Sequence, residues 1–311
     1  MGFRKASLLA AVAALAIGAA FSAEAKEAKT IGLAVANLQA NFFNQIKESV
    51  EAEGAAKGIK IITVDAKGDA ATQVNQIQDL LAQNIDALIY IPAGATAAAV
   101  PVKAARAAGV PVINVDRNAE GAPGDTFIAT DSVASAKQVC AWIAKQAGGK
   151  GEMLIIHGQK GTTPEVDRTK GCAEALKDFP DIKIVGQLWS EQWHQDEGFK
   201  LAQDLLQAHP KVDIIWGQAD ALALGAAQAV KVANPDHKIW VAGFDGDTAA
   251  LTALRDGVFD VTATQQTQKM GRMAVDSAIE LVEGKKLPAE QLQDATLTTK
   301  ENVGGFIEKH P

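Results

Sequence analysis

Polar side chains directly follow apolar segments at three places in the chain, where they could form a site for a small ligand. They are Asp116 with Arg117, Asp245, and Gln265. A carboxylate accepts hydrogen bonds from hydroxyl groups, a guanidinium donates through a planar fork, and an amide does both. Such residues could hold a neutral ligand rich in hydroxyl groups. Two adjacent unlike charges also occur as a solvated turn, so that interpretation stays open for the Asp–Arg pair.

Aromatic residues stand at a fourth place. Phe42 and Phe43, preceded by Asn41, follow the apolar segment 30–35 after a short polar turn and open a predicted helix. Aromatic rings cover the apolar faces of a sugar, while charged and amide groups bind its hydroxyl groups. Either ring could instead fasten the start of the helix to the core.

Short apolar runs predict the strands that must position these residues. The runs are 30–35, 59–64, 87–91, 111–115, 152–156, 182–188, 212–216, 239–244 and 261–264. Most are continuous rather than alternating, which is typical of parallel strands covered on both faces. Amphipathic helices are predicted between them: Val74, Ile77, Leu80 and Leu81 share one helical face. Gly58 and Gly109 are placed to end helices.

This alternation predicts a doubly wound α/β fold with parallel sheets, whose ligand crevice lies at the carboxyl ends of the strands. Two sheets suit 311 residues better than one sheet of nine or more strands. The segment 118–124 is rich in turn-forming residues and reads as a loop. A break between lobes is therefore expected near 129–132.

Residues 1–25 have the three-part pattern of a secretory signal peptide. Arg4 and Lys5 precede an apolar run, Leu8 to Phe21, and the small residues Ala23 and Ala25 mark a cleavage site after Ala25. The run is too short to span a bilayer comfortably. The sequence thus predicts an exported protein that is soluble outside the inner membrane, and its net charge of −7 argues against binding of nucleic acid.

Two cysteines, Cys140 and Cys172, would then lie in an oxidising compartment. An even number of cysteines there favours a disulfide, with two buried free thiols as the alternative.

Sequence signatures of catalysis are missing. We find no G-x-G-x-x-G after the first strand, no phosphate-binding loop and no G-x-S-x-G elbow. The five histidines lack the spacing of metal ligands. We therefore expect a protein that is not an enzyme and that uses neither a cofactor nor a metal.

Several motifs, taken in order, resemble the periplasmic sugar-binding proteins of ABC importers, of the ribose-binding type. The motifs are Asn41-Phe42-Phe43, 111–117 (PVINVDR), 208–210 (AHP), 223–226 (ALGA) and 241–246 (VAGFDG). The resemblance implies two Rossmann-like lobes joined by a three-strand hinge, with a ligand cleft between them. Residues 26–130 plus 266–294 would form the amino-terminal lobe, and 131–265 plus 295–311 the carboxyl-terminal lobe.

The resemblance also assigns ligand contacts. The positions that match are Asp116, Arg117, Asp245, Gln265 and Trp193, the last with a surface or core indole as its alternative. Three departures stand out: Ala40 replaces an Asn, with Asn41 displaced by one, Val166 replaces an Arg, with Arg168 two residues on, and Ala219 replaces an Asn. Glu165, Arg168 and His194 could supply replacement contacts.

Missing polar anchors predict a ligand other than ribose, because an unpaired buried hydroxyl costs about 1–3 kcal/mol. A deoxy or branched sugar, a short polyol or a cyclitol would fit. The expected partner is an ABC importer permease, for a monomeric binding protein. A non-sugar ligand such as a furanone signal, and presentation of the ligand to a chemoreceptor or sensor, remain alternatives.

Overall fold

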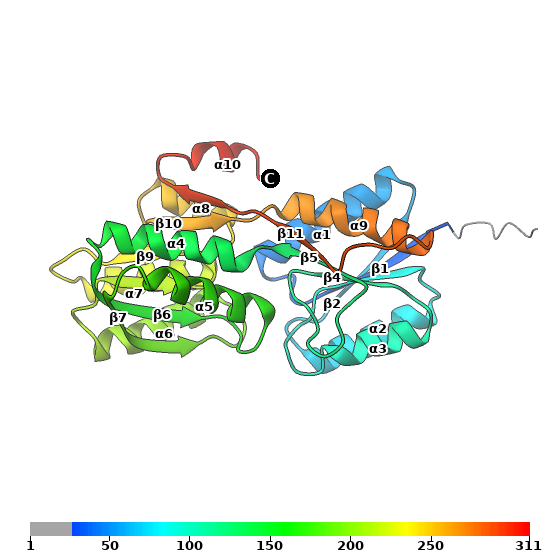
Figure 1. Ribbon diagram of the computed structural model, residues 1–311, viewed down its shortest axis with the longest axis horizontal. Helices are drawn as coiled ribbons and strands as arrows, with labels where there is room; N and C mark the ends of the chain where they lie inside the picture. The colour runs from blue at the N-terminus through cyan, green and yellow to red at the C-terminus, as the bar shows by residue number, and fades with distance from the viewer. Residues whose placement is uncertain (1–26) are drawn as a thin grey trace, which may run out of the picture.

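The computed structural model describes residues 27–311 as two lobes, each built on a six-stranded sheet (Figure 1). The expected signal peptide, 1–25, lies outside the described residues. Within the described part, no helix has the length and apolar character needed to cross a membrane.

The sheet of the amino-terminal lobe is entirely parallel, in the order β2-β1-β3-β4-β5-β11. Its strands are β1 (Thr30–Val35), β2 (Lys60–Asp65), β3 (Ala87–Tyr90), β4 (Val112–Val115), β5 (Thr126–Thr130) and β11 (Glu290–Gln293). Helices α1 (Asn41–Ala56) and α9 (Thr267–Val282) bury their apolar sides on one face of the sheet. Helices α2 (Ala70–Ala82) and α3 (Ala99–Ala107) cover the other face.

The sheet of the carboxyl-terminal lobe has the order β7-β6-β8-β9-β10-β12. Its strands are β6 (Lys150–His157), β7 (Asp181–Trp189), β8 (Ile214–Gly217), β9 (Trp240–Ala242), β10 (Val261–Thr264) and β12 (Thr296–Thr299), the last antiparallel to β10. Helices α4 (Ser132–Gln146) and α5 (Thr163–Leu176) pack on one face. Helices α6 (Gln195–Ala208), α7 (Asp220–Ala233) and α8 (Thr248–Arg255) pack on the other, and α10 (Gly304–Glu308) lies beside α8.

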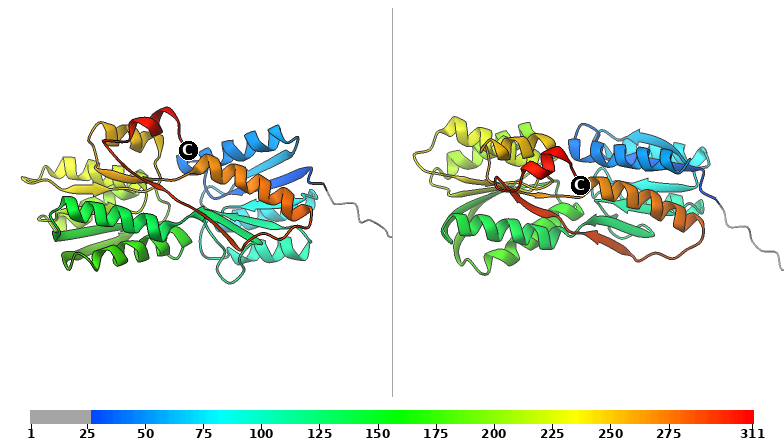
Figure 2. Two further views of the ribbon diagram at one scale, coloured as in Figure 1. Left: turned by 45° about the horizontal axis from the view of Figure 1, so that its top comes forward. Right: turned by 90° about the horizontal axis from the view of Figure 1, so that it is seen from above.

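Three segments of the chain cross between the lobes (Figure 2). The first joins β5 to α4, the second joins β10 to α9, and the third joins β11 to β12. Each crossing takes only one or two residues outside regular structure, 131, 265–266 and 294–295. Short crossings of this kind leave few backbone angles through which one lobe can turn against the other.

All nine predicted strands are present, and β1 and β10 begin and end at the predicted residues. Three strands, β5, β11 and β12, were not predicted. Their sequences are short and polar at the ends: TFIAT has three consecutive apolar residues, and EQLQ and TLTT have one apolar residue each. β11 and β12 are edge strands, which need apolar side chains least because they are covered least.

Helix ends and faces follow the sequence. Gly58 and Gly109 both have a φ of +70° just after α1 and α3, a conformation that glycine adopts without steric cost. On α2, Ile77 and Leu80 are buried, but so is the polar Gln73. Its amide donates to the carbonyl of Ile91 (2.8 Å) and accepts from the backbone of Ala93 (2.7 Å), which fixes the loop after β3.

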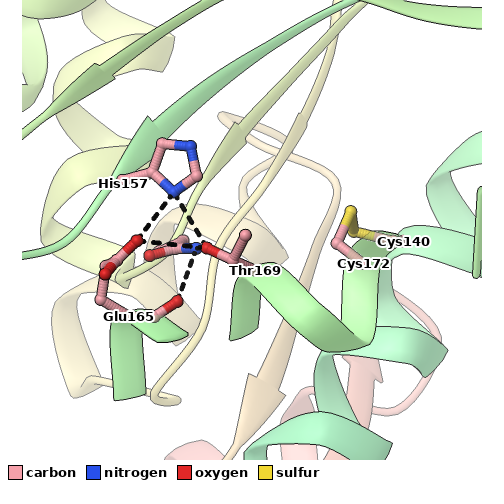
Figure 3. The surroundings of a disulfide bond; sticks show 6 residues. Cys140, His157, Glu165, Thr169 and Cys172 are labelled. Carbon is pink, nitrogen blue, oxygen red and sulfur yellow. Dashed lines mark hydrogen bonds and ion pairs between the residues drawn. A yellow bond between two sulfur atoms is a disulfide. The ribbon is translucent and has the colours of Figure 1, made fainter. Parts of the chain in front are cut away.

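A disulfide joins Cys140 of α4 to Cys172 of α5, as the sequence analysis favoured (Figure 3). Both cysteines are buried in the apolar layer between these helices and their sheet. The bond therefore fastens the two helices of one face to each other.

Candidate functional site

A cavity of 310 Å³ lies between the lobes, where β1 and β4 of one sheet and β9 of the other end. Its size is at the lower end of the range for small-molecule sites, about 300–1,000 Å³. Eight of the nine residues predicted to bind ligand line it together: Asn41, Phe42, Phe43, Asp116, Arg117, Arg168, Trp193 and Asp245.

Gln265, the ninth, does not line the cavity. It is buried behind Asp245, to whose carboxylate its amide donates at 2.8 Å, and it accepts from the hydroxyl of Thr130 at 2.6 Å. These bonds join the ends of β5 and β10 at the hinge. Gln265 therefore holds Asp245 in place instead of facing the cavity.

Asp116 and Arg117 form a buried ion pair at the floor of the cavity, so they are not a solvated turn. Only 6% and 5% of their surfaces are exposed, and Arg117 Nε lies 3.6 Å from the Asp116 carboxylate. Burial raises the pKa of Asp116, and the adjacent Arg117 charge opposes that rise. Arg117 Nη1 donates to the Pro92 carbonyl (3.1 Å) and to Gln159 of the other lobe (3.3 Å). Its buried Nε has no hydrogen-bond partner within the described residues.

Arg168 and Asp245 form a second ion pair, in the opposite lobe. Arg168 Nη2 lies 3.3 Å from the Asp245 carboxylate, and Nη1 donates to the carbonyl of Gln218 at 2.5 Å. Burial raises the pKa of Asp245, against the effect of Arg168. Among residues 27–311, the buried Arg168 Nε also lacks a hydrogen-bond partner. Val166, two residues earlier on α5, points outward and is half exposed.

Three cavity residues have an unusual backbone conformation. Asp116, Trp193 and Asp245 have φ values of +61°, +64° and +132°, although none is glycine. Such conformations cost about 1–3 kcal/mol each and cluster at functional sites. Here they turn side chains at the ends of β4 and β9, and at the start of α6, into the cavity.

Aromatic rings form two walls of the cavity. Phe42 and Phe43 meet edge to face at 5.3 Å, and they belong to the core beneath α1 as well as to the cavity, so both alternatives for them hold. Trp193 lies on the other lobe, with Arg117 and Arg168 each 5.6 Å from its ring. Its ring covers Gly158, where a Cβ would overlap the indole.

Small apolar residues complete the site. Ala40, Ala219, Ala221, Leu224 and Ala249 line the cavity. Ala40 and Ala219 are two of the positions where the sequence departs from the resembling family. This part of the wall offers no side-chain partner to a hydroxyl group.

Sequence reasoning missed Asp247, which lines the cavity two residues after Asp245. The signal was present as a second acid after the same predicted strand. Burial and the neighbouring charge of Asp220 raise the pKa of Asp247 to about 7. Asp220, buried behind it, has a pKa raised to about 6 by burial.

Of the suggested replacement contacts, Arg168 and His194 line the cavity and Glu165 does not. The Glu165 carboxylate points away, accepting from the backbone of Gly161 (3.0 Å) and from Trp189 Nε1 (3.2 Å). It also lies 3.4 Å from His157 Nδ1 (Figure 3), and the His157 ring stacks on Trp189 at 4.5 Å. Burial lowers the pKa of His157, which favours the neutral imidazole.

Trp193 is the one of the five tryptophans that lines the cavity. Trp216 is fully buried in the core, and Trp189 is partly exposed on the edge strand β7.

Hydrogen bonds beside the cavity also join the lobes directly. Asn37 bonds His194 at 3.0 Å, the backbone of Asn118 donates to Thr163 Oγ1 at 3.0 Å, and Asn41 donates to Asp247 at 3.4 Å. These contacts flank the cavity and hold the two lobes together around it.

No group of His, Cys, Asp or Glu among residues 27–311 is arranged to hold a metal ion. What the cavity offers is hydrogen bonding and ring stacking. The buried cationic forks and carboxylates can bind hydroxyl groups, and the aromatic walls can cover the apolar faces of a small ring or chain.

Several known proteins are similar to this chain in sequence and in fold. The ribose import binding protein of Bacillus subtilis is 33% identical over 263 residues, which are 84% of each protein. The xylitol-binding protein of Mycolicibacterium smegmatis is 29% identical and covers 94% of this chain and 83% of its own. An ABC transporter solute binding protein from Bacillus halodurans, solved with bound myo-inositol, matches with a TM-score of 0.85. It is 26% identical and covers 93% of this chain and 100% of its own.

A second solved structure, an ABC transporter solute binding protein from Mycobacterium smegmatis with bound glycerol, is 30% identical. Its TM-score is 0.85, covering 90% of this chain and 97% of its own. The family described as periplasmic binding protein domain matches residues 31–286. Membership in a family of binding proteins agrees with the expectation that this chain is not an enzyme. The chain therefore belongs to the periplasmic binding protein family.

Proposed function

We propose that this protein captures a small carbohydrate-like ligand between its lobes and delivers it to an ABC importer. The observation that carries the proposal is the cavity itself. Two buried Asp–Arg pairs, one from each lobe, line the cavity together with the aromatic walls. A hydroxyl-rich ligand could accept from the guanidinium groups, donate to the carboxylates and so bridge the lobes.

We further propose the ligand contacts and the location. Asn41, Phe42, Phe43, Asp116, Arg117, Arg168, Trp193 and Asp245 would touch the ligand, and Gln265 would act through Asp245. The signal peptide would be cleaved after Ala25, releasing a monomer into the periplasm. The lobes would be 26–130 plus 266–294 and 131–265 plus 295–311, which assigns each described sheet to one lobe.

The apolar wall narrows the ligand class. Ala40 and Ala219 offer no hydrogen bond, and Val166 faces outward, so a hydroxyl group directed at this wall would stay unpaired. The ligand would be a deoxy or branched sugar, a short polyol or a cyclitol, and ribose would bind weakly.

A thermal-shift screen tests this function. The purified protein is melted with pentoses, hexoses, deoxy sugars, polyols and cyclitols, since a ligand of the folded state raises the melting temperature. We expect a shift confined to one stereochemical group. No shift with any carbohydrate would contradict the proposal and turn attention to a non-sugar such as a furanone, and tight binding of ribose would refute the narrower class.

A further inference from the structure

One carboxylate of the cavity lacks a cationic partner. The wall carries three acids but two arginines, and Asp116 and Asp245 already pair with them. Within residues 27–311, no Lys, Arg or His nitrogen lies within 4.0 Å of the Asp247 carboxylate. His194, the remaining titratable side chain of the wall, bonds Asn37 instead. The cavity therefore has one acid, Asp247, whose charge, when it is ionised, no cation of the described residues neutralises.

Neighbouring groups do not balance this charge. Among residues 27–311, the Asp247 side chain accepts one hydrogen bond, a long one of 3.4 Å from the amide of Asn41 across the cleft. Asp247 directly precedes α8, at the N-cap position, yet its side chain makes no capping bond there. The acid behind it, Asp220, accepts from Thr262 and from the backbone of Gly246 and Asp247 at 2.6, 2.7 and 2.9 Å, and adds repulsion.

The arginines at the floor of the same cavity need hydrogen-bond acceptors from a ligand, not a positive charge. Arg117 and Arg168 both line it, and each is at least 95% buried. Guanidinium N–H groups only donate hydrogen bonds, so they bind oxygen acceptors. A ligand that satisfies the whole cavity thus presents oxygens at the floor and a positive charge toward Asp247.

We propose that the ligand is a polyol, cyclitol or sugar that carries a protonated amine, and that Asp247 binds this amine. The inference rests on the proposed carbohydrate-binding function and adds the charge of the ligand to it. An ammonium group donates charge-assisted hydrogen bonds to a carboxylate, which are stronger than those of a neutral hydroxyl. Asn41 faces Asp247 across the cleft, and its amide would help to hold the carboxylate in position.

Calorimetry with matched probes at pH 7.5 tests the proposal. Each pair differs in one group: glycerol and 2-amino-1,3-propanediol, galactose and galactosamine, and myo-inositol and its monoamino analogue. We expect at least one amino probe to bind about tenfold more tightly than its hydroxyl partner, or better, since tenfold corresponds to about 1.4 kcal/mol.

Two variants show whether Asp247 is the cause. Asp247→Asn keeps the shape of the side chain, and we expect it to abolish the preference for the amino probe. Asp196→Asn is the matched control, because Asp196 is an exposed acid of α6 paired with Lys200 outside the cavity lining. It should keep the preference. Melting curves without ligand confirm that both variants are folded.

The remaining outcomes separate the two levels of the argument. If a hydroxyl probe binds and its amino partner binds no better, the amine is wrong while carbohydrate binding stands. A preference that survives in Asp247→Asn would refute the role of Asp247. If no probe of either kind binds, the proposed function is contradicted, and so is the proposal that the ligand carries an amine.

Discussion

At the scale of single residues, Gly158 decides where the indole of Trp193 can lie. Gly158 directly follows β6, and its missing side chain leaves the space that the Trp193 ring occupies. One side of the ring faces the cavity, and two guanidinium groups lie next to the ring. A glycine that looks like an ordinary loop residue in the sequence thereby shapes one wall of the site.

We predict that Gly158→Ala weakens ligand binding about tenfold or more without unfolding the protein, because the added methyl group displaces a ring that contributes about 1–3 kcal/mol when buried. Trp193→Ala should weaken binding similarly. The double variant should bind no worse than Trp193→Ala alone, since the methyl group then has nothing to displace. Titration calorimetry measures all three, and additive losses in the double variant would contradict the contact.

Asp247 should also make stability depend on pH. An exposed Asp titrates near about 3.9, whereas burial and Asp220 raise the pKa of folded Asp247 to about 7. Between these values the folded state holds a proton that the unfolded chain has lost. Stability from this group is full below the unfolded pKa and is lost as pH rises through the folded pKa.

We therefore expect the melting temperature of ligand-free Asp247→Asn, relative to the unmodified protein, to be higher at pH 8 than at pH 5. Asparagine carries no charge to repel Asp220 at the higher pH. The comparison between variants cancels the other titrating groups, including the buried His157. A difference in melting temperature that stays constant from pH 5 to pH 8 would show that ionisation of Asp247 does not destabilise the folded protein.

Single residues also show how far the sequence could predict the site. Charged residues after strands are visible in a sequence, so Asp116, Arg117 and Asp245 could be predicted. Gln265 follows a strand in the same way, but whether its amide reaches the ligand or the carboxylate before it depends on packing at the hinge. Asp247 was missed because an acid at the start of a helix usually faces solvent.

At the scale of elements, short apolar segments identified nine strands, whereas β5, β11 and β12 stayed hidden. β11 and β12 pair with strands that lie far away in the sequence. A hydrogen bond between side chains of β11 and β5 joins residues 165 apart, and one between β12 and β10 joins residues 34 apart. Their hydrogen-bond ladders, not their side chains, make them strands. Patterns of side chains cannot reveal such pairing.

The disulfide is a second element-scale feature. Cys172 lies one helical turn after Arg168 on α5, so the bond to α4 anchors the helix that carries a cavity arginine. Its two cysteines are 32 residues apart, a loop whose closure stabilises the folded state by about 3–4 kcal/mol.

We predict that Cys140→Ala/Cys172→Ala lowers the free energy of unfolding by about 3–4 kcal/mol, because the unfolded chain regains the entropy of the open loop. Denaturant titration measures the loss. Reduction of the unmodified protein by dithiothreitol serves as a control and should give a loss of the same sign. Equal stability of the oxidised protein and the double variant would contradict the prediction.

At the scale of the whole molecule, direct hydrogen bonds between the lobes hold them together around the cavity. The bond from the Asn118 backbone to Thr163 Oγ1 is one that a single substitution can remove. Neither residue lines the cavity. Affinity for ligand should therefore depend on residues that never touch it, through the share of molecules that are closed.

We predict that Thr163→Val shifts the ligand-free protein toward open forms. Losing this bond, worth about 1 kcal/mol, lowers apparent affinity by up to about fivefold. Small-angle scattering should show a larger radius of gyration without ligand and an unchanged one with saturating ligand. Thr252→Val, which removes an exposed hydroxyl bond within α8, is the control. An unchanged radius and affinity would mean that this bond does not govern closure.

The buried floor of the cavity has a consequence for timing. Asp116, Arg117, Arg168 and Asp245 are each less than 10% exposed, and the side chains around them also join the lobes to each other. A ligand held there cannot exchange with solvent at the speed of diffusion. The rate of ligand binding should therefore reach a limit at high ligand concentration, and that limit is the rate at which the two lobes open. The rate of ligand release is likewise limited by opening of the lobes, which occurs spontaneously or on binding to a partner protein.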